Sequence, residues 1–171
     1  MHVVVMGVTG SGKTTVGMRL AAETGAEFAD ADDFHSPDAV AKMAVNDPLT
    51  DDDRWPWLDR VGGWLAAGDN RVVACSALRR VYRDAIRAHA PNAIFIHLWA
   101  EQHELEHRVR RRAKAEGHFA GPGLLDSQFA TLENLQDDEL GASVDVVSYS
   151  PEGAAMMARV AIDAARGAQS N

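Results

Sequence analysis

Residues 7–14 have the sequence Gly7-Val8-Thr9-Gly10-Ser11-Gly12-Lys13-Thr14 and follow directly on an apolar run. They match the phosphate-binding pattern G-x-x-x-x-G-K-[ST] at every fixed position. Its glycines let the backbone turn N–H groups inward and approach phosphate oxygens closely, and a helix that starts there adds its positive end. We therefore expect a nucleoside triphosphate in this loop, with Lys13 at its β- and γ-phosphates and the Thr14 hydroxyl on Mg²⁺.

Two kinds of segment alternate along the rest of the chain. Short apolar runs rich in Val, Ile and Phe are followed by longer segments of helical period, which is typical of βαβ units and a parallel sheet. Right-handed crossovers would place helices on both faces of a five-stranded sheet, giving a three-layer α/β P-loop fold with its chemistry at the carboxyl ends of the strands. We expect strands at 2–6, 27–30, 71–75, 93–98 and 144–148, and helices at 12–24, 37–45, 54–67, 78–89, 101–115, 124–135 and 152–167.

Size and composition narrow the class of protein. The 171 residues fit a single domain over 1–171, and the one cysteine, Cys75, excludes an internal disulfide framework. The N-terminus lacks the basic region of a signal peptide, and no apolar run reaches the roughly 18 residues that would span a membrane. The net charge of -8 disfavours nucleic acid. We expect a cytoplasmic protein that acts on a small molecule.

The second expected strand ends in acidic residues, Asp30-Ala31-Asp32-Asp33. In a parallel sheet this end lies beside the phosphate loop. We expect an extended segment in which Asp30 and Asp32 share one side, because side chains alternate with period two. One carboxylate could then bind Mg²⁺ through water while the other accepts the proton of a substrate hydroxyl. The alternative is an acidic loop that faces solvent.

Other classes of P-loop protein fit less well. GTPases need an Asn-Lys-x-Asp stretch that reads the base, and no Asn of this chain is followed by Lys. Motor and transporter ATPases need a strand that ends in Asp, whereas the apolar run 71–75 is followed by Ser76. A kinase that acts on a small molecule or a nucleotide agrees better with both observations.

Residues 48–58 add information on the substrate. Thr50 or Asp51 could cap the helix that follows, and acidic residues suit a helix N-terminus. Arg54 has no such structural role, and its guanidinium could clamp a substrate carboxylate with two parallel hydrogen bonds. An anionic metabolite is therefore the expected class of substrate.

These motifs, in this order, resemble the gluconokinase family over about residues 3–150. The segment 48–58 is the most specific part of the likeness, because most other P-loop kinases lack it. The other segments that carry it are the phosphate loop and residues 30–35, 42–43, 75–78, 82–84, 117–119, 124–129 and 132–133.

The resemblance implies phosphorylation of D-gluconate at its 6-hydroxyl by ATP with Mg²⁺, a fold like that of shikimate kinases, and a homodimer. Asp32 would be the base, with Lys13 and Arg112 as further catalytic residues, and a mobile lid at about 110–128 would close over ATP. Nucleotide would contact residues 7–14, Thr15, Arg108 and Arg112. The substrate would contact Asp32, His35, Arg54, Ser76, Arg79, His118 and Gln128, and the metal would bind at Thr14 and Asp30.

Five positions depart from the residues usual in that family: Ser36, Ala39, Asn46, Arg79 and Leu135. Arg79 keeps the charge of the usual lysine but changes its reach and hydrogen-bond geometry. Since none of the five lies in the phosphate loop or the acidic pair, they affect the choice of substrate rather than the reaction. Two alternatives stay open: a shikimate-like or other sugar-acid kinase, and a catalytically silent nucleotide-binding module.

Overall fold

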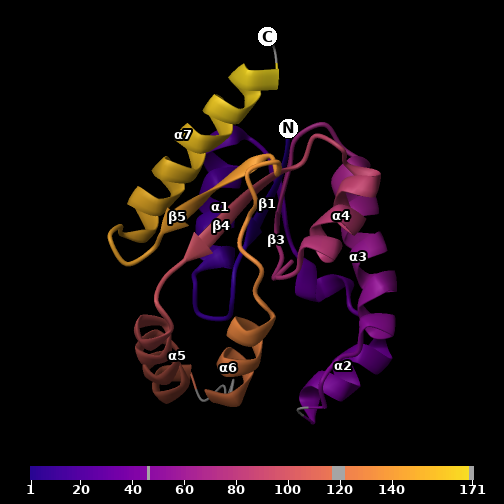
Figure 1. The fold of residues 1–171 in the computed structure, drawn as a ribbon, viewed down its shortest axis with the longest axis vertical. Helices are drawn as coiled ribbons and strands as arrows, with labels where there is room; N and C mark the ends of the chain where they lie inside the picture. The colour runs from indigo at the N-terminus through magenta and orange to yellow at the C-terminus, as the bar shows by residue number, and fades with distance from the viewer. Residues whose placement is uncertain (46, 117–121, 170–171) are drawn as a thin grey trace.

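The computed structural model describes the backbone of residues 1–45, 47–116 and 122–169, in which five parallel strands form one sheet (Figure 1). The strand order is β2-β3-β1-β4-β5, so β1 lies in the centre and the phosphate loop leaves the middle of the carboxyl edge. The bounds are β1 (His2–Met6), β2 (Glu27–Asp30), β3 (Arg71–Ala74), β4 (Ile94–Trp99) and β5 (Gly141–Asp145). The three-layer α/β fold expected from the sequence is confirmed.

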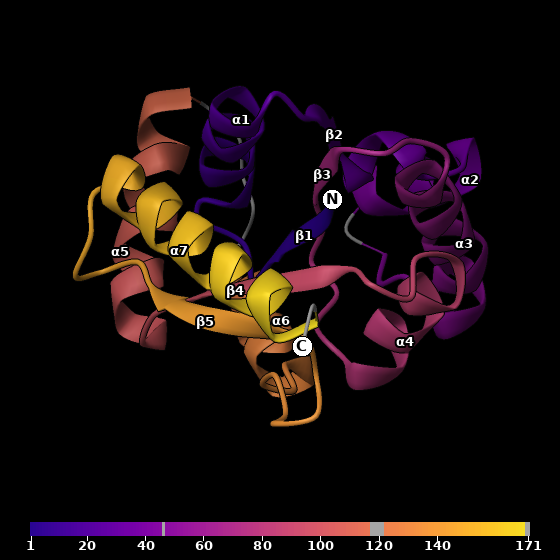
Figure 2. The ribbon, with the colours of Figure 1, turned by 90° about the horizontal axis from the view of Figure 1, so that it is seen from above.

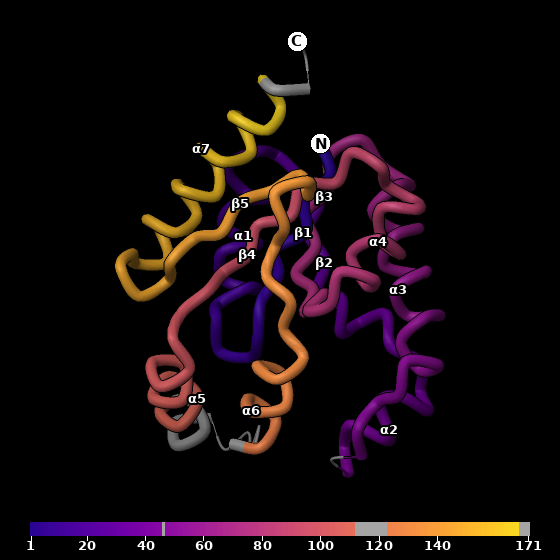
Figure 3. The backbone as a smooth tube through the Cα atoms, in the orientation of Figure 1, coloured from indigo at the N-terminus to yellow at the C-terminus, as the bar shows by residue number. Residues whose placement is uncertain are grey.

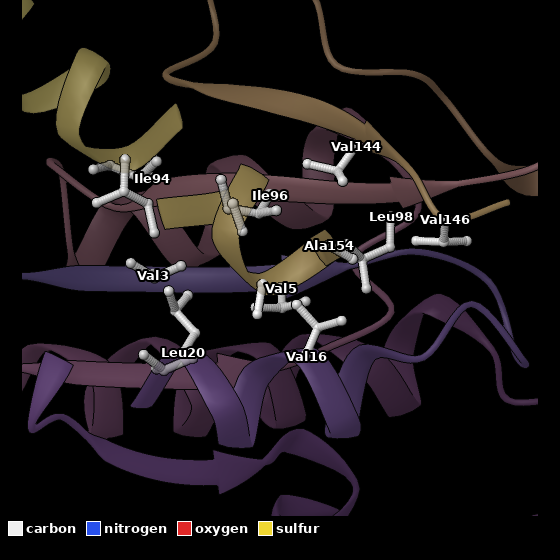
Figure 4. Close-up of a cluster of buried hydrophobic side chains, with 14 of the residues drawn as sticks. Val3, Val5, Val16, Leu20, Ile94, Ile96, Leu98, Val144, Val146 and Ala154 are labelled. Atoms are coloured by element: carbon white, nitrogen blue, oxygen red, sulfur yellow. The ribbon is translucent and has the colours of Figure 1, made fainter. Parts of the chain in front are cut away.

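Helices cover both faces of the sheet (Figure 2). α1 (Lys13–Thr24) and α7 (Pro151–Gln169) pack on one face, and α3 (Asp51–Ala66) and α4 (Arg80–His89) pack on the other. Side chains of β1 alternate between these layers, because successive residues of a strand point to opposite faces. Val3 and Val5 join the cluster around α1 and α7 (Figure 4), whereas Val4 and Met6 join the cluster under α3 and α4.

Three further helices lie toward the carboxyl edge of the sheet (Figure 1). These are α2 (Pro37–Ala44), α5 (Gln102–Glu116) and α6 (Pro122–Thr131). The expected lid at about 110–128 includes residues 117–121, which lie outside the described part, so the lid stays a prediction. None of the helices in the described ranges is long and apolar enough to cross a membrane.

The last strand differs most from its expected position, because it begins at Gly141 rather than at residue 144. Gly141 pairs with Phe95, and a Cβ at this glycine would lie 2.1 Å from the Phe95 carbonyl oxygen. The strand ends at Asp145, whose carboxylate accepts hydrogen bonds from the Val147 and Ser148 N–H groups. A run of valines suggested a later strand, but close backbone approach and this turn fix its ends.

Local hydrogen bonds also move two helix boundaries. α3 begins at Asp51, three residues before the expected start, because Thr50 and Asp53 form a reciprocal capping box. α6 ends at Thr131 rather than at residue 135. From there the chain runs back to β5 as an irregular segment (Figure 3), and the Glu133 N–H donates to the Leu78 carbonyl at 2.8 Å. That bond ties this segment to the loop after β3.

Candidate active site

The phosphate loop connects β1 to α1 and depends on glycine at its two ends. Gly7 has φ 145°, and a Cβ there would lie 2.6 Å from the Leu98 carbonyl oxygen. Gly12, the N-cap of α1, has φ 94°. Both angles lie in the region that L-residues with a side chain rarely adopt. The loop therefore has the conformation that the motif predicted, at the positive end of a 12-residue helix.

Lys13 and Thr14 are the first residues of α1, and their side chains lie near the phosphate loop and the end of β2. The Lys13 Nζ donates to the Val8 carbonyl at 3.1 Å, so the ammonium group lies over the loop itself. Burial lowers the pKa of Lys13, while Asp32 and Asp30 act in the opposite direction. The Thr14 hydroxyl donates to a carboxylate oxygen of Asp30 at 2.9 Å.

The Thr14–Asp30 pair fits a magnesium ion that phosphate oxygens and water complete. Mg²⁺ prefers oxygen ligands and usually takes only one or two side chains beside the phosphates. Within the described residues no group of three or more His, Cys, Asp or Glu side chains gathers to form a cage made by protein alone. A hydroxyl and a carboxylate side by side are therefore the donor set that such a site needs.

Asp32 lies next to this pair, although not as the sequence suggested. Residues 31–34 form a 3₁₀ helix, so the extended alternation expected for this segment is wrong. Asp30 caps that helix by accepting the Asp32 N–H at 3.2 Å, and this contact keeps the two acidic residues together. Water reaches most of the Asp32 side chain, which is 84% exposed. Partial loss of hydration and the nearby Asp30 nevertheless raise the pKa of Asp32, against Lys13.

His35 and Trp57 pack against the 3₁₀ helix that carries Asp32. The His35 ring stacks on Trp57, with ring centroids 4.5 Å apart and an angle of 9° between the planes. Its Nε2 lies 3.9 Å from an Asp32 oxygen, and burial lowers the pKa of His35. The Trp57 indole N–H donates to the Ala31 carbonyl at 2.6 Å. Trp57 thus fixes both the 3₁₀ helix and the imidazole beside the proposed base.

A second group of polar and charged residues, here called the acid end because it is expected to bind the acid group of the substrate, consists of Asp51, Arg54, Arg79 and Tyr82. One Asp51 oxygen accepts from the Tyr82 hydroxyl at 2.6 Å and from Arg54 at 3.2 Å. The other accepts from Arg79 at 3.0 Å. The Tyr82 hydrogen bond, followed by Arg79, lowers the pKa of Asp51. Two guanidinium groups from different elements are thereby held together around one carboxylate.

A buried ion pair connects α4 with the segment that precedes β5. Arg83, on α4, is fully buried and forms two hydrogen bonds to Glu139, at 2.7 and 2.6 Å. Its remaining N–H groups donate to the carbonyls of residues 77, 78, 133 and 134. Burial alone would raise the pKa of Glu139, but Arg83 and Arg87 outweigh it and lower this pKa to about 2. The pair joins the loop after β3 to the segment after α6.

A cavity of about 600 Å³ opens on the other side of the phosphate loop. Apolar and aromatic groups of the loop before α7 form one wall, and basic groups of α5 form another. Its lining includes Gly12, Thr15, Arg108, Val146, Tyr149 and Ala154. Because it reaches Gly12 and the start of α1, it is placed to hold the nucleoside of a nucleotide whose phosphates lie in the loop. The sequence indicated Thr15 and Arg108 but not the 146–154 wall.

Two of the remaining expected site residues, Ser76 and Gln128, contact the phosphate loop. Ser76 contributes its carbonyl, which accepts from the Gly7 N–H at 3.4 Å. Gln128 contacts the phosphate loop, where its side-chain oxygen accepts from the Thr9 N–H at 2.6 Å. The Arg112 side chain and His118 lie outside the part that the structure describes.

Comparison with known proteins agrees with this arrangement. A family model described as an AAA domain matches residues 3–135. The gluconokinase of Gluconobacter oxydans is 46% identical over 140 residues, which cover 80% of this chain and 77% of the relative. The chain belongs to the gluconokinase family.

Solved structures support the same conclusion. A gluconokinase from Sinorhizobium meliloti 1021 matches with a TM-score of 0.86 and 38% identity, covering 98% of this chain and 95% of the other. A shikimate kinase from Aquifex aeolicus matches with a TM-score of 0.61 at 13% identity, covering 96% and 97% of the two chains. The second match is a likeness of fold alone. The resemblance inferred from the short motifs is therefore confirmed, while the roles of individual residues stay predictions.

Proposed function

We propose that this protein transfers the γ-phosphoryl group of ATP to the 6-hydroxyl of D-gluconate, giving 6-phosphogluconate and ADP. Two observations support the proposal in a chain of the gluconokinase family: Asp32 is held beside the phosphate loop through Asp30 and Thr14, and two arginines gather around Asp51. The loop suits the triphosphate, and the arginines suit the carboxylate of a sugar acid.

In this reaction Asp32 accepts the proton of the 6-hydroxyl as its oxygen bonds to the γ-phosphorus. The bond between this phosphorus and the oxygen that leaves with ADP breaks at the same time. Lys13 and the N–H groups of the loop stabilise the charge on the transferred group, which is the main task in phosphoryl transfer. The raised pKa of Asp32 makes it a better proton acceptor than an ordinary aspartate, provided that it is ionised.

Thr14 and Asp30 would hold Mg²⁺, which supplies positive charge to the β- and γ-phosphates. Arg54 and Arg79 bind the carboxylate of gluconate and so fix the opposite end of the substrate. From the family resemblance we also propose a homodimer, a cytoplasmic location and a lid that carries Arg112 and His118. Sedimentation of the purified protein tests the first of these.

A panel of acceptors tests the assignment. Purified protein with Mg-ATP should release ADP far faster with gluconate than with shikimate or glucose. Faster turnover of another sugar acid would move the assignment within the sugar-acid kinases. Flat traces for every acceptor, with ATP still bound, would support a silent nucleotide-binding module instead.

A further inference from the structure

We propose that Asp51 is a positioning residue for the substrate carboxylate: it holds Arg54 and Arg79 together, so that one carboxylate meets both guanidinium groups. The inference rests on the proposed function, because it assigns the sugar-acid carboxylate to this pair. No helix cap explains the position of Asp51. Thr50 and Asp53 already form the capping box of α3, and the Asp51 carboxylate instead bonds side chains.

The two arginines come from separate parts of the fold. Arg54 lies in the first turns of α3, and Arg79 is the N-cap of α4, so no local geometry fixes the distance between them. Both guanidinium carbons lie over the Tyr82 ring, 5.7 and 5.3 Å from its centroid. Two cations on one ring repel each other unless an anion lies between them. Asp51 supplies this anion before the substrate arrives.

The hydrogen bonds leave room for a second carboxylate. Arg54 uses its Nη1 for Asp51 and Tyr82. Arg79 uses its Nη1 for Asp51, and its Nε lies 3.6 Å from a carboxylate oxygen of Glu133. A guanidinium has five N–H donors arranged as a fork, so further donors of each arginine can serve a ligand. An arginine that is held in place loses less freedom on binding than a free one, and this preorganisation strengthens binding.

A purely structural role is the rival interpretation. The Asp51 side chain is 42% exposed, and its partners Arg54 and Arg79 are 30% and 36% exposed. Ion pairs that water reaches to this extent contribute little to folding. Loss of the Asp51 charge should therefore alter binding of an acid far more than it alters the melting temperature.

The experiment compares Asp51→Asn with the wild type and with Asp52→Asn. Asp52 is exposed and lies beside Asp51 in the first turn of α3, so the control removes the same charge from the same helix end. Asp51→Asn should raise the KM for gluconate about 10- to 100-fold, the loss expected for charged hydrogen bonds. The kcat should stay within about threefold, and the KM for ATP and the melting temperature should match the control.

Several results would overturn the proposal. An unchanged KM for gluconate would remove Asp51 from substrate binding, and a lower KM would mean that Asp51 competes with the substrate for the arginines. A lower kcat, higher KM values for both substrates and a lower melting temperature, all together, would indicate a structural role alone. Calorimetric titration of the wild-type protein with gluconate separates the two claims. If the wild type neither binds nor phosphorylates gluconate, the proposed function fails and this inference fails with it. If the wild type binds and phosphorylates gluconate but Asp51→Asn behaves like the wild type, only this inference fails.

Discussion

The phosphate loop and the acid end serve the same reaction but are built in different ways. Backbone N–H groups of one contiguous stretch, residues 7–14, form the phosphate side, and glycine angles and the start of α1 fix their directions. Side chains from α3 and from the start of α4 form the acid end, and a single carboxylate joins them. Backbone geometry resists most substitutions outside the glycines, whereas one charge change can rearrange the acid end. We therefore expect the phosphate side to govern kcat and the acid end to govern selection of the substrate.

The largest effect should come from Asp32→Asn, which keeps the shape of the side chain but removes the proton acceptor. We expect kcat to fall about 10²- to 10⁴-fold, while ATP affinity and the KM for gluconate stay near their wild-type values. Asp33→Asn removes the neighbouring exposed charge and should change kcat little. A kcat for Asp32→Asn within about threefold of the wild type would show that Asp32 is not the base.

The pH profile gives a second measure of the same residue. The pKa of Asp32 is raised by reduced hydration and by Asp30, and only the ionised form can accept the proton. The wild-type kcat/KM should therefore decline as pH falls toward the pKa of Asp32. Asp32→Asn should lose this acid limb.

The second effect should appear in the stability of the fold and comes from His97, a buried residue of β4. Burial, with a smaller contribution from Arg83, lowers the pKa of His97 to about 4 from its ordinary 6.5. The folded state therefore binds fewer protons than the unfolded state between these values. Stability is complete above pH 6.5 and should fall by roughly 3 kcal/mol as pH drops to 4. Thermal melting across this range measures the fall.

Comparison with Glu139 and His103 distinguishes the contribution of His97 to the pH dependence of stability from that of other groups. Glu139, with its pKa lowered to about 2 from 4.5, loses its share of stability only below pH 4.5. His103 is exposed, so His103→Gln should leave the melting curves unchanged. His97→Gln should make the slope below pH 6.5 shallower, and His35, whose pKa burial also lowers, should account for part of the slope that remains. An equally steep slope in that variant would assign the effect to another group.

The smallest effect should come from Gln128, which the family resemblance placed with the substrate and the structure places against the phosphate loop. Gln128→Ala removes the hydrogen bond to the Thr9 N–H. We expect the KM for ATP to rise about 3- to 10-fold, as for loss of one such bond, with the KM for gluconate unchanged. Ser127→Ala, on the same helix, is the matched control. A rise in the KM for gluconate alone would show instead that Gln128 binds the substrate.

The sequence predicted the position and the backbone conformation of the phosphate loop, because this loop is one contiguous motif after an apolar strand. It also predicted that Asp30 and Asp32 lie beside the loop, but the 3₁₀ helix between them was not foreseen, since it depends on the Asp30 cap and the Trp57 hydrogen bond. A short segment of aspartates carries no signal that distinguishes such a turn from an extended strand end.

The acid end was predicted only in part. Arg54 was expected to bind a carboxylate, whereas Thr50 or Asp51 was expected to cap a helix, and Thr50 is the residue that does so. Two of the partners of Asp51, Arg79 and Tyr82, lie 28 and 31 residues away, and spacing within one segment cannot reveal them. The ion pair of Arg83 and Glu139 spans 56 residues and was missed for the same reason. A single arginine among the apolar positions of α4, between Tyr82 and Ile86, was the available signal.

The arrangement around Arg83 limits how such kinases can be redesigned. Its guanidinium fastens residues 77–78 and 133–134 to one another through four carbonyl oxygens. Neither stretch can therefore be exchanged for a homologue's version while the other keeps its own length and path. A design that changes the acceptor specificity of this protein should therefore replace residues 77–78 and 133–134 together and keep the arginine that bonds both.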